Sequence, residues 1–225
     1  MEEQPQIERA ERLVRTAVAT MESVEPFGWM VAAEAKARGF YAAVAKAVVG
    51  DGGNWIGPLA DLHFPGFTQV LDFLHLLVHL YAAATAAHRG QAKLAWSLYE
   101  QWIRQAWSGQ VKPLIAGLQT ACERLGPPPP KASDDDPRRI VSLALEYVKN
   151  NAHRMDYAKY RRTGLPITST AVESPIEQFN KRVKGTEQFW LEGGAEAILQ
   201  VRAAYLSEDD RVTQFHDHRR PGRAV

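Results

Sequence analysis

The sequence predicts an α/β protein that is mostly helical and contains about two short parallel strands. Apolar residues recur at helical spacing over most of the 225 residues, which indicates amphipathic helices. Two short apolar runs, at residues 45–49 and 68–71, are typical of strands instead, and a helical stretch separates them. A strand, a helix and a second strand form a βαβ unit, so we expect the two strands to be parallel.

The first half of the chain supplies both strands. Helices are expected over residues 5–24 and 26–40. The strand at 45–49 runs into the cluster Gly50-Asp51-Gly52-Gly53, which predicts a sharp turn or an exposed loop. A helix over 54–62 and a turn then lead to the strand at 68–71, which Asp72 follows directly.

The second half is predicted to be helical. The residues at 73–87 are strongly apolar, so this helix should be buried. Further helices are expected at residues 91–107, 111–125, 137–151, 171–185 and 194–206. A proline run and an acidic run at 127–136 predict a surface loop, and the polar tail from residue 207 is expected to be loose.

Composition places the chain among ordinary globular proteins. Hydrophobic residues make up 45% and charged residues 24% of the sequence. No apolar run approaches the roughly 20 residues that cross a bilayer, and the polar, acidic start is unlike a signal peptide. Cys122 is the only cysteine, so it cannot form an internal disulfide, and we expect it to act as a small buried hydrophobe. A cytoplasmic location fits these features.

Basic residues gather in one part of the chain. Between Arg138 and Lys184 ten Lys and Arg stand against four acids, a net charge of +6, whereas the whole chain carries +1. Such a local excess can attract a nucleic-acid backbone, although a solvated helix face looks the same in sequence.

Asp51 is the first residue that could carry chemistry. It lies just past the end of a predicted parallel strand, the edge at which α/β proteins gather ligands and catalytic groups. The glycines on either side leave room for a metal ion or a phosphate to come close. An ordinary Asp-Gly turn would have the same sequence.

Asp72, His75 and His79 can share one face at the start of the helix predicted at 73–87. Asp72 can serve as the helix N-cap, and this spacing is no specific metal-ligand code. For His79 a structural polar contact is the simpler interpretation.

Glu173 opens the helix predicted at 171–185, which Ser169 and Thr170 can cap. A carboxylate in the first turn stabilises a helix by roughly 0.3–1 kcal/mol through the helix dipole. This structural role is enough to explain a glutamate at position 173. Lys181, Arg182 and Lys184 follow on the same helix. One acid and several cations together would suit a site that holds a metal ion and a phosphodiester.

Taken together, the segments resemble the C-terminal half of bacterial insertion-sequence transposases of the ISKra type. The resemblance rests on short motifs in order over about 175 residues. The motifs in the first half are Val48-Val49-Gly50-Asp51-Gly52, Trp55-Ile56, His63-Phe64-Pro65 and Leu71-Asp72-Phe73-Leu74-His75. Those in the second half are Asn151-x-His153-Arg154-Met155-x-Tyr157, Gly164-Leu165-Pro166-Ile167, Val172-Glu173-Ser174, Arg182-Val183-Lys184-Gly185 and Ala195-x-Ala197-Ile198-Leu199-x-Val201-Arg202-Ala203.

These transposases belong to the DDE superfamily, so the resemblance implies a partial ribonuclease-H-like core with a large helical insertion. It makes Asp51 the second acid of the catalytic triad and Glu173 the final glutamate, together holding Mg²⁺ or Mn²⁺. Asp72 and His75 correspond to the Asp-x-x-His signature after the second acid. The implied partner is DNA, both transposon ends and target, in a bacterial, nucleoid-associated setting, with a homo-oligomer possible. Six basic residues are the expected DNA contacts: Arg154, Arg161, Arg162, Lys181, Arg182 and Lys184.

The resemblance also implies a layout of segments. We expect N-terminal helices at 1–43, the partial core at 44–90, the helical insertion at 91–152, a core segment with the glutamate helix at 153–206, and a flexible tail at 207–225. No acid before residue 44 stands in strand context, so the first catalytic aspartate has no counterpart here. The sequence therefore predicts a truncated transposase with little activity in DNA recombination by itself. Thr168-Ser169-Thr170 also departs from the Gly-Ser-Gly often found before the glutamate.

Other functions remain open at this point. One is a non-catalytic DNA-binding remnant that uses the basic stretch, and another is a decayed reading frame whose product does not fold stably. A third is a helical metal-binding protein that uses Asp72, His75 and His79. A nuclease with the same core would differ from a transposase only in its products.

Overall fold

The computed structural model describes residues 15–169 and 192–219. Two compact units divide the chain: one spans residues 43–169, and the other combines the residues before 43 with those after 169. The described part is mostly helical with one small parallel sheet, as the sequence predicts.

The sheet consists of β1 (Ala47–Gly50) and β2 (Thr68–Leu71), with α2 (Ile56–His63) between them in the chain. The strands are parallel, and their register pairs Ala47 with Thr68 and Gly50 with Leu71. Among the described residues these are the only strands. The predicted βαβ unit is therefore confirmed, and both strands end at the same edge.

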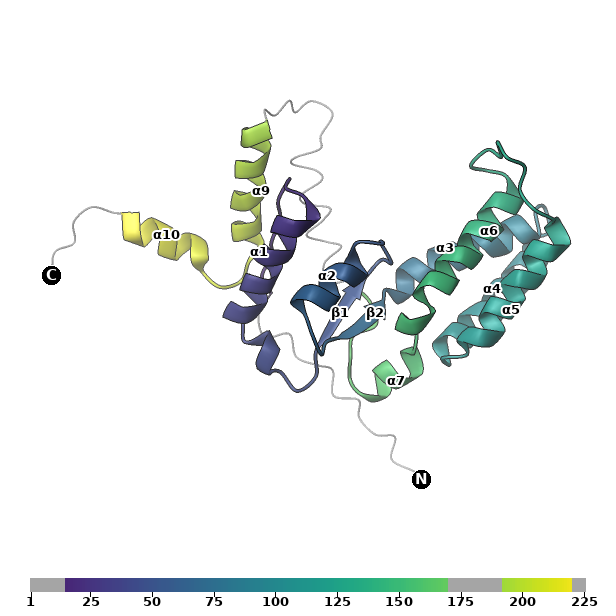
Figure 1. Ribbon diagram of the computed structural model, residues 1–225, viewed down its shortest axis with the longest axis horizontal. Coiled ribbons are helices and arrows are strands. Elements are labelled where there is room, and N and C mark those ends of the chain that lie inside the picture. The colour runs from purple at the N-terminus through teal and green to yellow at the C-terminus, as the bar shows by residue number, and fades with distance from the viewer. Residues whose placement is uncertain (1–14, 170–191, 220–225) are drawn as a thin grey trace, which may run out of the picture. The chain divides into compact units, whose positions relative to one another are not determined.

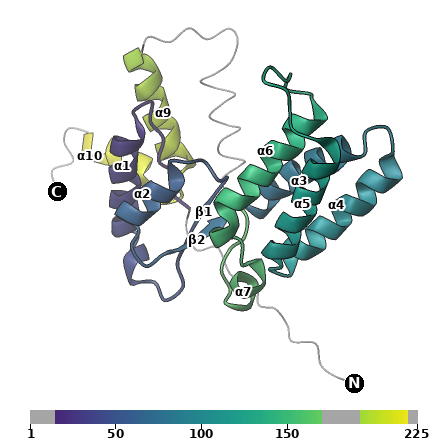
Figure 2. The same cartoon turned by 45° about the vertical axis from the view of Figure 1, so that its right-hand side comes forward.

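A helical layer follows the sheet in the same unit, and Figures 1 and 2 show its four long helices side by side. These helices are α3 (Phe73–Ala87), α4 (Ala92–Trp107), α5 (Val111–Leu125) and α6 (Pro137–Asn151). The short η2 (Ala152–Arg154) and α7 (Tyr157–Arg162) complete the unit. α3 packs against α4 and α6, and α5 packs against the same two helices, so each of the four long helices has two neighbours among them.

The core of this unit is one hydrophobic cluster shared by β2 and the helices. Val70 and Leu71 enter it from the strand, Leu76 and Leu80 from α3, and Trp102 from α4, all less than 2% exposed. The cluster thus joins residues from the predicted core segment at 44–90 with residues from the predicted insertion at 91–152. The two segments fold as one body.

The other unit contains α1 (Val24–Ala37), η1 (Phe40–Ala42), α9 (Glu192–Leu206) and α10 (Arg211–Arg219). Two expectations are wrong here. Residues 15–23, predicted as the end of a first helix, are not helical, and the tail from residue 207, predicted to be loose, contains α10. None of the described helices is long and apolar enough to cross a membrane.

Candidate functional site

The two strands deliver an aspartate each to the same edge of the sheet. Gly50 and Leu71 are register partners at the strand ends, and Asp51 and Asp72 are the next residues. The ladder continues one step, since the backbone N–H of Asp72 donates to the carbonyl of Gly50 at 2.7 Å. The fold therefore brings these two aspartates to one edge of the sheet, the edge at which α/β proteins gather ligands.

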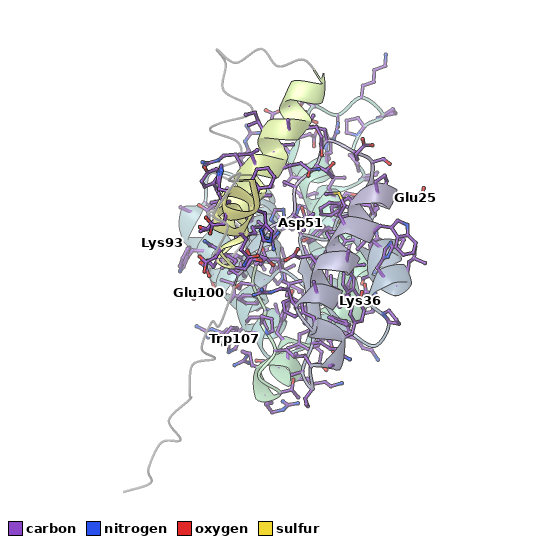
Figure 3. All side chains as sticks on the ribbon, turned by 90° about the vertical axis from the view of Figure 1, so that its left-hand side faces the viewer. Glu25, Lys36, Asp51, Lys93, Glu100 and Trp107 are labelled. Atoms are coloured by element: carbon purple, nitrogen blue, oxygen red, sulfur yellow. The ribbon has the colours of Figure 1, made fainter. Side chains whose placement is uncertain are left out.

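Asp51 has an exposed side chain on a fixed backbone. Its Oδ1 accepts a hydrogen bond from the backbone N–H of Gly53 at 2.9 Å, which closes the turn. Its carbonyl accepts a hydrogen bond from the Tyr147 hydroxyl on α6 at 2.7 Å. Figure 3 labels this aspartate. Its other carboxylate oxygen accepts no hydrogen bond from the described residues, so the group can reach a ligand from solvent.

Asp72 differs from Asp51, because the residue is 1% exposed and both of its carboxylate oxygens accept hydrogen bonds. Oδ1 caps α3 by accepting from the backbone N–H of His75 at 3.0 Å. Oδ2 accepts from the backbone N–H of Ser169 at 2.6 Å and from the Ser169 hydroxyl. Asp72 therefore anchors the segment at Ser169 to the sheet edge, and the N-cap interpretation holds for this residue.

Hydrogen bonding sets the ionisation of Asp72. Burial raises its pKa, but the hydrogen bonds from the Ser169 side chain and from the backbone at His75, Ser169 and Leu74 outweigh burial and lower the pKa overall. The carboxylate is therefore negative at neutral pH, and its hydrogen-bond donors compensate for the buried charge.

His79 packs on Tyr147 beside this edge. The two rings stack with centroids 3.9 Å apart, and the His75 ring lies 5.9 Å from that of His79. Burial, then the charge of His75, lowers the pKa of His79, while the negative charge of Asp51 acts in the opposite direction. At neutral pH His79 is thus a neutral ring that supports Tyr147. His75 is exposed.

The basic residues of the predicted DNA surface differ in placement. Arg154 is 7% exposed, and its Nη2 donates to Oδ1 of Asn151 at 2.6 Å. Arg161 is exposed and covers the ring of Trp107, labelled in Figure 3, with its guanidinium carbon 3.6 Å from the ring centroid. Arg162 is exposed as well. Two of these three are available to a phosphate at the surface.

Four predicted site residues lie outside the described residues: Glu173, Lys181, Arg182 and Lys184. Within residues 15–169 and 192–219, no three His, Cys, Asp or Glu side chains come together as a metal-binding group.

Sequence reasoning missed two residues of this site, Tyr147 and Ser169 in its role as the partner of Asp72. Helical spacing offered a signal for the first, since Tyr147 and Asn151 stand four residues apart on α6. Both face the turn after Asp51: a Cβ on Gly52 would lie 2.8 Å from Tyr147 Cε2 and 3.1 Å from Asn151 Nδ2. No comparable local pattern links Ser169 to Asp72, which precedes it by 97 residues.

Comparisons of the chain with protein-family models, with curated proteins and with solved structures gave no match.

Proposed function

We propose that this chain supplies the second aspartate and the glutamate of a DDE-type DNA transposase. In this proposal β1 and β2 belong to a ribonuclease-H-like core, Asp51 binds a divalent metal ion, and Glu173 completes the metal site. The observation that carries the proposal is the parallel strand pair, which ends at one edge with Asp51 exposed and the chain before Glu173 anchored beside it.

The setting of Asp51 suits a metal ligand. Hard cations such as Mg²⁺ and Mn²⁺ prefer carboxylate oxygens. A metal-binding residue needs an accessible side chain on a rigid backbone. Asp51 is exposed, while Tyr147 and Gly53 hold its carbonyl and its Oδ1 by hydrogen bonds of 2.7 and 2.9 Å. Burial, then the charges of Asp51 and Asp72, raises the pKa of Tyr147, so its hydroxyl stays protonated and can donate.

Asp72 acts here as a positioning residue. Two hydrogen bonds from Ser169 reach its Oδ2, and the backbone N–H of Phe73 donates to the carbonyl of Ile167 at 2.9 Å. Glu173 follows Ser169 by four residues, and four residues of chain span at most about 14 Å. Covalent reach therefore permits Glu173 to approach the edge where Asp51 stands.

The reaction that this site would serve is phosphodiester hydrolysis and strand transfer. Two metal ions roughly 3.5–4 Å apart would stabilise the attacking and leaving oxygens of an in-line displacement. Asp51 and Glu173 are the two acids that we assign to the metal site. Because we identify no third, we expect weak metal binding and little cleavage of DNA by this chain alone.

Iron-directed cleavage of the protein tests the metal site without requiring enzymatic activity. Fe²⁺ replaces Mg²⁺ at carboxylate sites and, with ascorbate and peroxide, cuts the polypeptide next to the bound ion. We expect cuts near Asp51 and near Glu173 in the full chain, mapped by mass spectrometry, and competition by excess Mg²⁺. Asp51→Asn should remove both cuts.

Asp134→Asn is the matched control, since Asp134 has a side chain 94% exposed in the surface loop and should leave the cuts unchanged. Cuts near Asp51 alone would remove Glu173 from the site, and an absence of cuts near Asp51 would refute the metal assignment. A Mg²⁺-dependent strand-cleavage assay adds a second reading. Robust cleavage that Asp51→Ala abolishes would contradict the expected low activity, and its products would separate strand transfer from simple nuclease action.

A further inference from the structure

A polar pocket opens beside the turn that carries Asp51. Its volume is about 380 Å³, within the ~300–1,000 Å³ that small-ligand sites span. Gly52 and Asn54 line it from the turn, and Asn151 and Arg154 line it from the end of α6 and from η2. The remaining lining residues are Gly57, Pro58, Asp61, Gln69, Asn150 and His153.

Arg154 is the unusual member of this pocket, because it is buried and pairs with no carboxylate in the part of the chain that the structure describes. The residue is 7% exposed, and its one side-chain hydrogen bond goes to the neutral amide of Asn151. Its Nε is buried without a hydrogen-bond partner among residues 15–169 and 192–219. No carboxylate of the described residues forms an ion pair with it. Burying a guanidinium without an ion pair costs several kcal/mol of folding free energy. The residues around Arg154 do not offset this cost.

The other groups around the pocket favour an anion over a cation. Asn54, Asn150 and Asn151 carry amide N–H₂ groups that can donate to phosphate oxygens. Among the described residues of the lining, Asp61 is the only acid, and it is exposed with its Oδ1 bonded to Nε2 of Gln69 at 2.7 Å. Arginine presents a planar fork of N–H donors that suits phosphate, and here that fork is already fixed by Asn151.

We infer that this pocket binds a phosphodiester of the DNA backbone, with Arg154 as its counter-charge. The inference rests on the proposed function for the identity of the ligand as DNA, whereas the anion site itself rests on the pocket alone. Arg154 donates to the side chain of Asn151 at 2.6 Å, and the Asn151 amide donates to the backbone carbonyl of Tyr147 at 2.8 Å. The hydroxyl of the same tyrosine donates to the Asp51 carbonyl at 2.7 Å. A phosphate held by Arg154 would thus be fixed relative to the turn that presents Asp51.

Thermal unfolding of the full chain with inorganic phosphate tests the anion site. A ligand that binds only the folded state raises Tm, so phosphate should raise Tm above the value in chloride of equal ionic strength. Arg154→Met should abolish this phosphate-specific rise. Without phosphate its Tm should not fall below that of the wild type, because the substitution removes an unpaired buried charge.

Two further variants keep the test decisive if Arg154→Met folds poorly. Asn150→Asp places a carboxylate on the pocket wall at an exposed position and should also abolish the rise. Arg89→Met removes an exposed charge outside the pocket and should keep the rise. No phosphate-specific rise in the wild type, or an unchanged rise in Asn150→Asp, would overturn the anion site.

A short DNA duplex then identifies the source of the phosphate. In a direct phosphate-binding measurement, the duplex should displace phosphate from the wild type at low salt. Phosphate that DNA cannot displace would refute the backbone assignment. A phosphate-specific rise in Tm without iron-directed cuts near Asp51 would support the anion pocket and refute the metal site. Cuts near Asp51 without a rise in Tm would support the metal site and refute the anion pocket.

Discussion

At the scale of single residues, Gly52 sets how closely the Asp51 turn approaches α6. Its φ is +89°, a value that a residue with a Cβ adopts at a cost. A Cβ there would also lie 2.8 Å from Tyr147 Cε2 and 3.0 Å from Leu71 Cδ1. Both atoms belong to side chains packed in or against the core, so neither can move away freely.

Gly52→Ala should therefore destabilise the protein for two reasons. The positive φ costs roughly 1–2 kcal/mol, and overpacking adds about 1–3 kcal/mol. Denaturant unfolding of wild type and variant measures the sum. Gly66→Ala is the matched control, since Gly66 has φ +79° but no atom within 4 Å of its Cβ position. Equal losses in the two variants would show that the close approach to α6 contributes nothing.

Asp72 makes a second prediction, on pH dependence. Its pKa is lowered in the folded protein, because hydrogen bonds from Ser169 and from the backbone at His75 outweigh the opposing effect of burial. A carboxyl whose pKa is lower in the folded than in the unfolded state stabilises the fold above the unfolded-state pKa of about 3.9. This stabilisation is lost as the pH falls through the folded-state pKa. Protonation of Asp72 should therefore lower the stability of the fold only in acid, below about pH 4.

Asp72→Asn separates this contribution from the other carboxylates. The amide oxygen of asparagine can still cap α3, but the amide nitrogen that replaces Oδ2 cannot accept the bonds from Ser169, so we expect a loss of about 1–3 kcal/mol at pH 7. Urea unfolding at pH 7 and pH 3 should show a smaller fall in stability with acid for the variant than for the wild type. Parallel curves would mean that the bonds from Ser169 do not lower the pKa of Asp72.

At the scale of elements, the sequence predicted β2 and α3 with the bounds that the structure has. Thr68–Leu71 is a short apolar run between turn residues, and α3 is strongly apolar from Phe73 to Ala87. Asp72 between them is a good N-cap, which marks where the helix begins. Local pattern and tertiary burial agree at these positions, so local reasoning succeeded.

The sequence-based prediction was wrong where side chains distant in the chain determine the backbone conformation. Residues 15–20 have helical composition, yet the N–H groups of Arg15 and Ala17 donate to the side chains of Glu208 and Ser207. Met21 donates likewise to Glu196 at 2.6 Å. These partners lie at least 175 residues away in the chain, so no local pattern reveals them.

The helix α10 was missed for a similar reason. Its sequence is polar, with little apolar surface to bury. Its first residue, Arg211, donates to Asp209 at 2.6 Å and to Glu34 of α1 at 2.7 Å. The bond to Glu34 joins residues 177 positions apart, and it fixes the start of a helix that composition alone describes as loose tail.

The contact of α4 with α5 yields a prediction in which packing opposes helix propensity. Gly117 lies inside α5, where alanine is favoured by up to about 1 kcal/mol. A Cβ at this position would lie 2.7 Å from Nε1 of Trp102, a buried side chain of α4. Because the indole is rigid and enclosed, Gly117→Ala should lower stability by about 1–2 kcal/mol, seen as a lower Tm.

A double-mutant cycle identifies the cause. Trp102→Phe removes the indole N–H, which has no hydrogen-bond partner to lose. In this background Gly117→Ala should cost little or should stabilise, because the clash is gone and the gain in propensity remains. A cost that stays the same in both backgrounds would place the strain elsewhere in α5.

At the scale of the whole molecule, residues 43–169 contain a complete core of their own. All buried members of the main cluster lie between Val70 and Tyr160, and the helices α3 to α6 cover one another around Leu76, Leu80 and Trp102. A two-stranded sheet cannot be stable alone, so this helical layer is what holds β1 and β2 in place. The unit should not need the rest of the chain to fold.

Expression of residues 43–169 alone tests this expectation and the idea of a decayed, unstable product together. We expect a helical circular-dichroism spectrum and one cooperative thermal transition, because the apolar cluster is buried within the unit. Non-cooperative unfolding with binding of a hydrophobic dye would show instead that the exposed edges of β1 and β2 need further chain to cover them. If the unit folds and Gly52→Ala lowers its Tm as in the full chain, the Asp51 turn is formed by this unit alone.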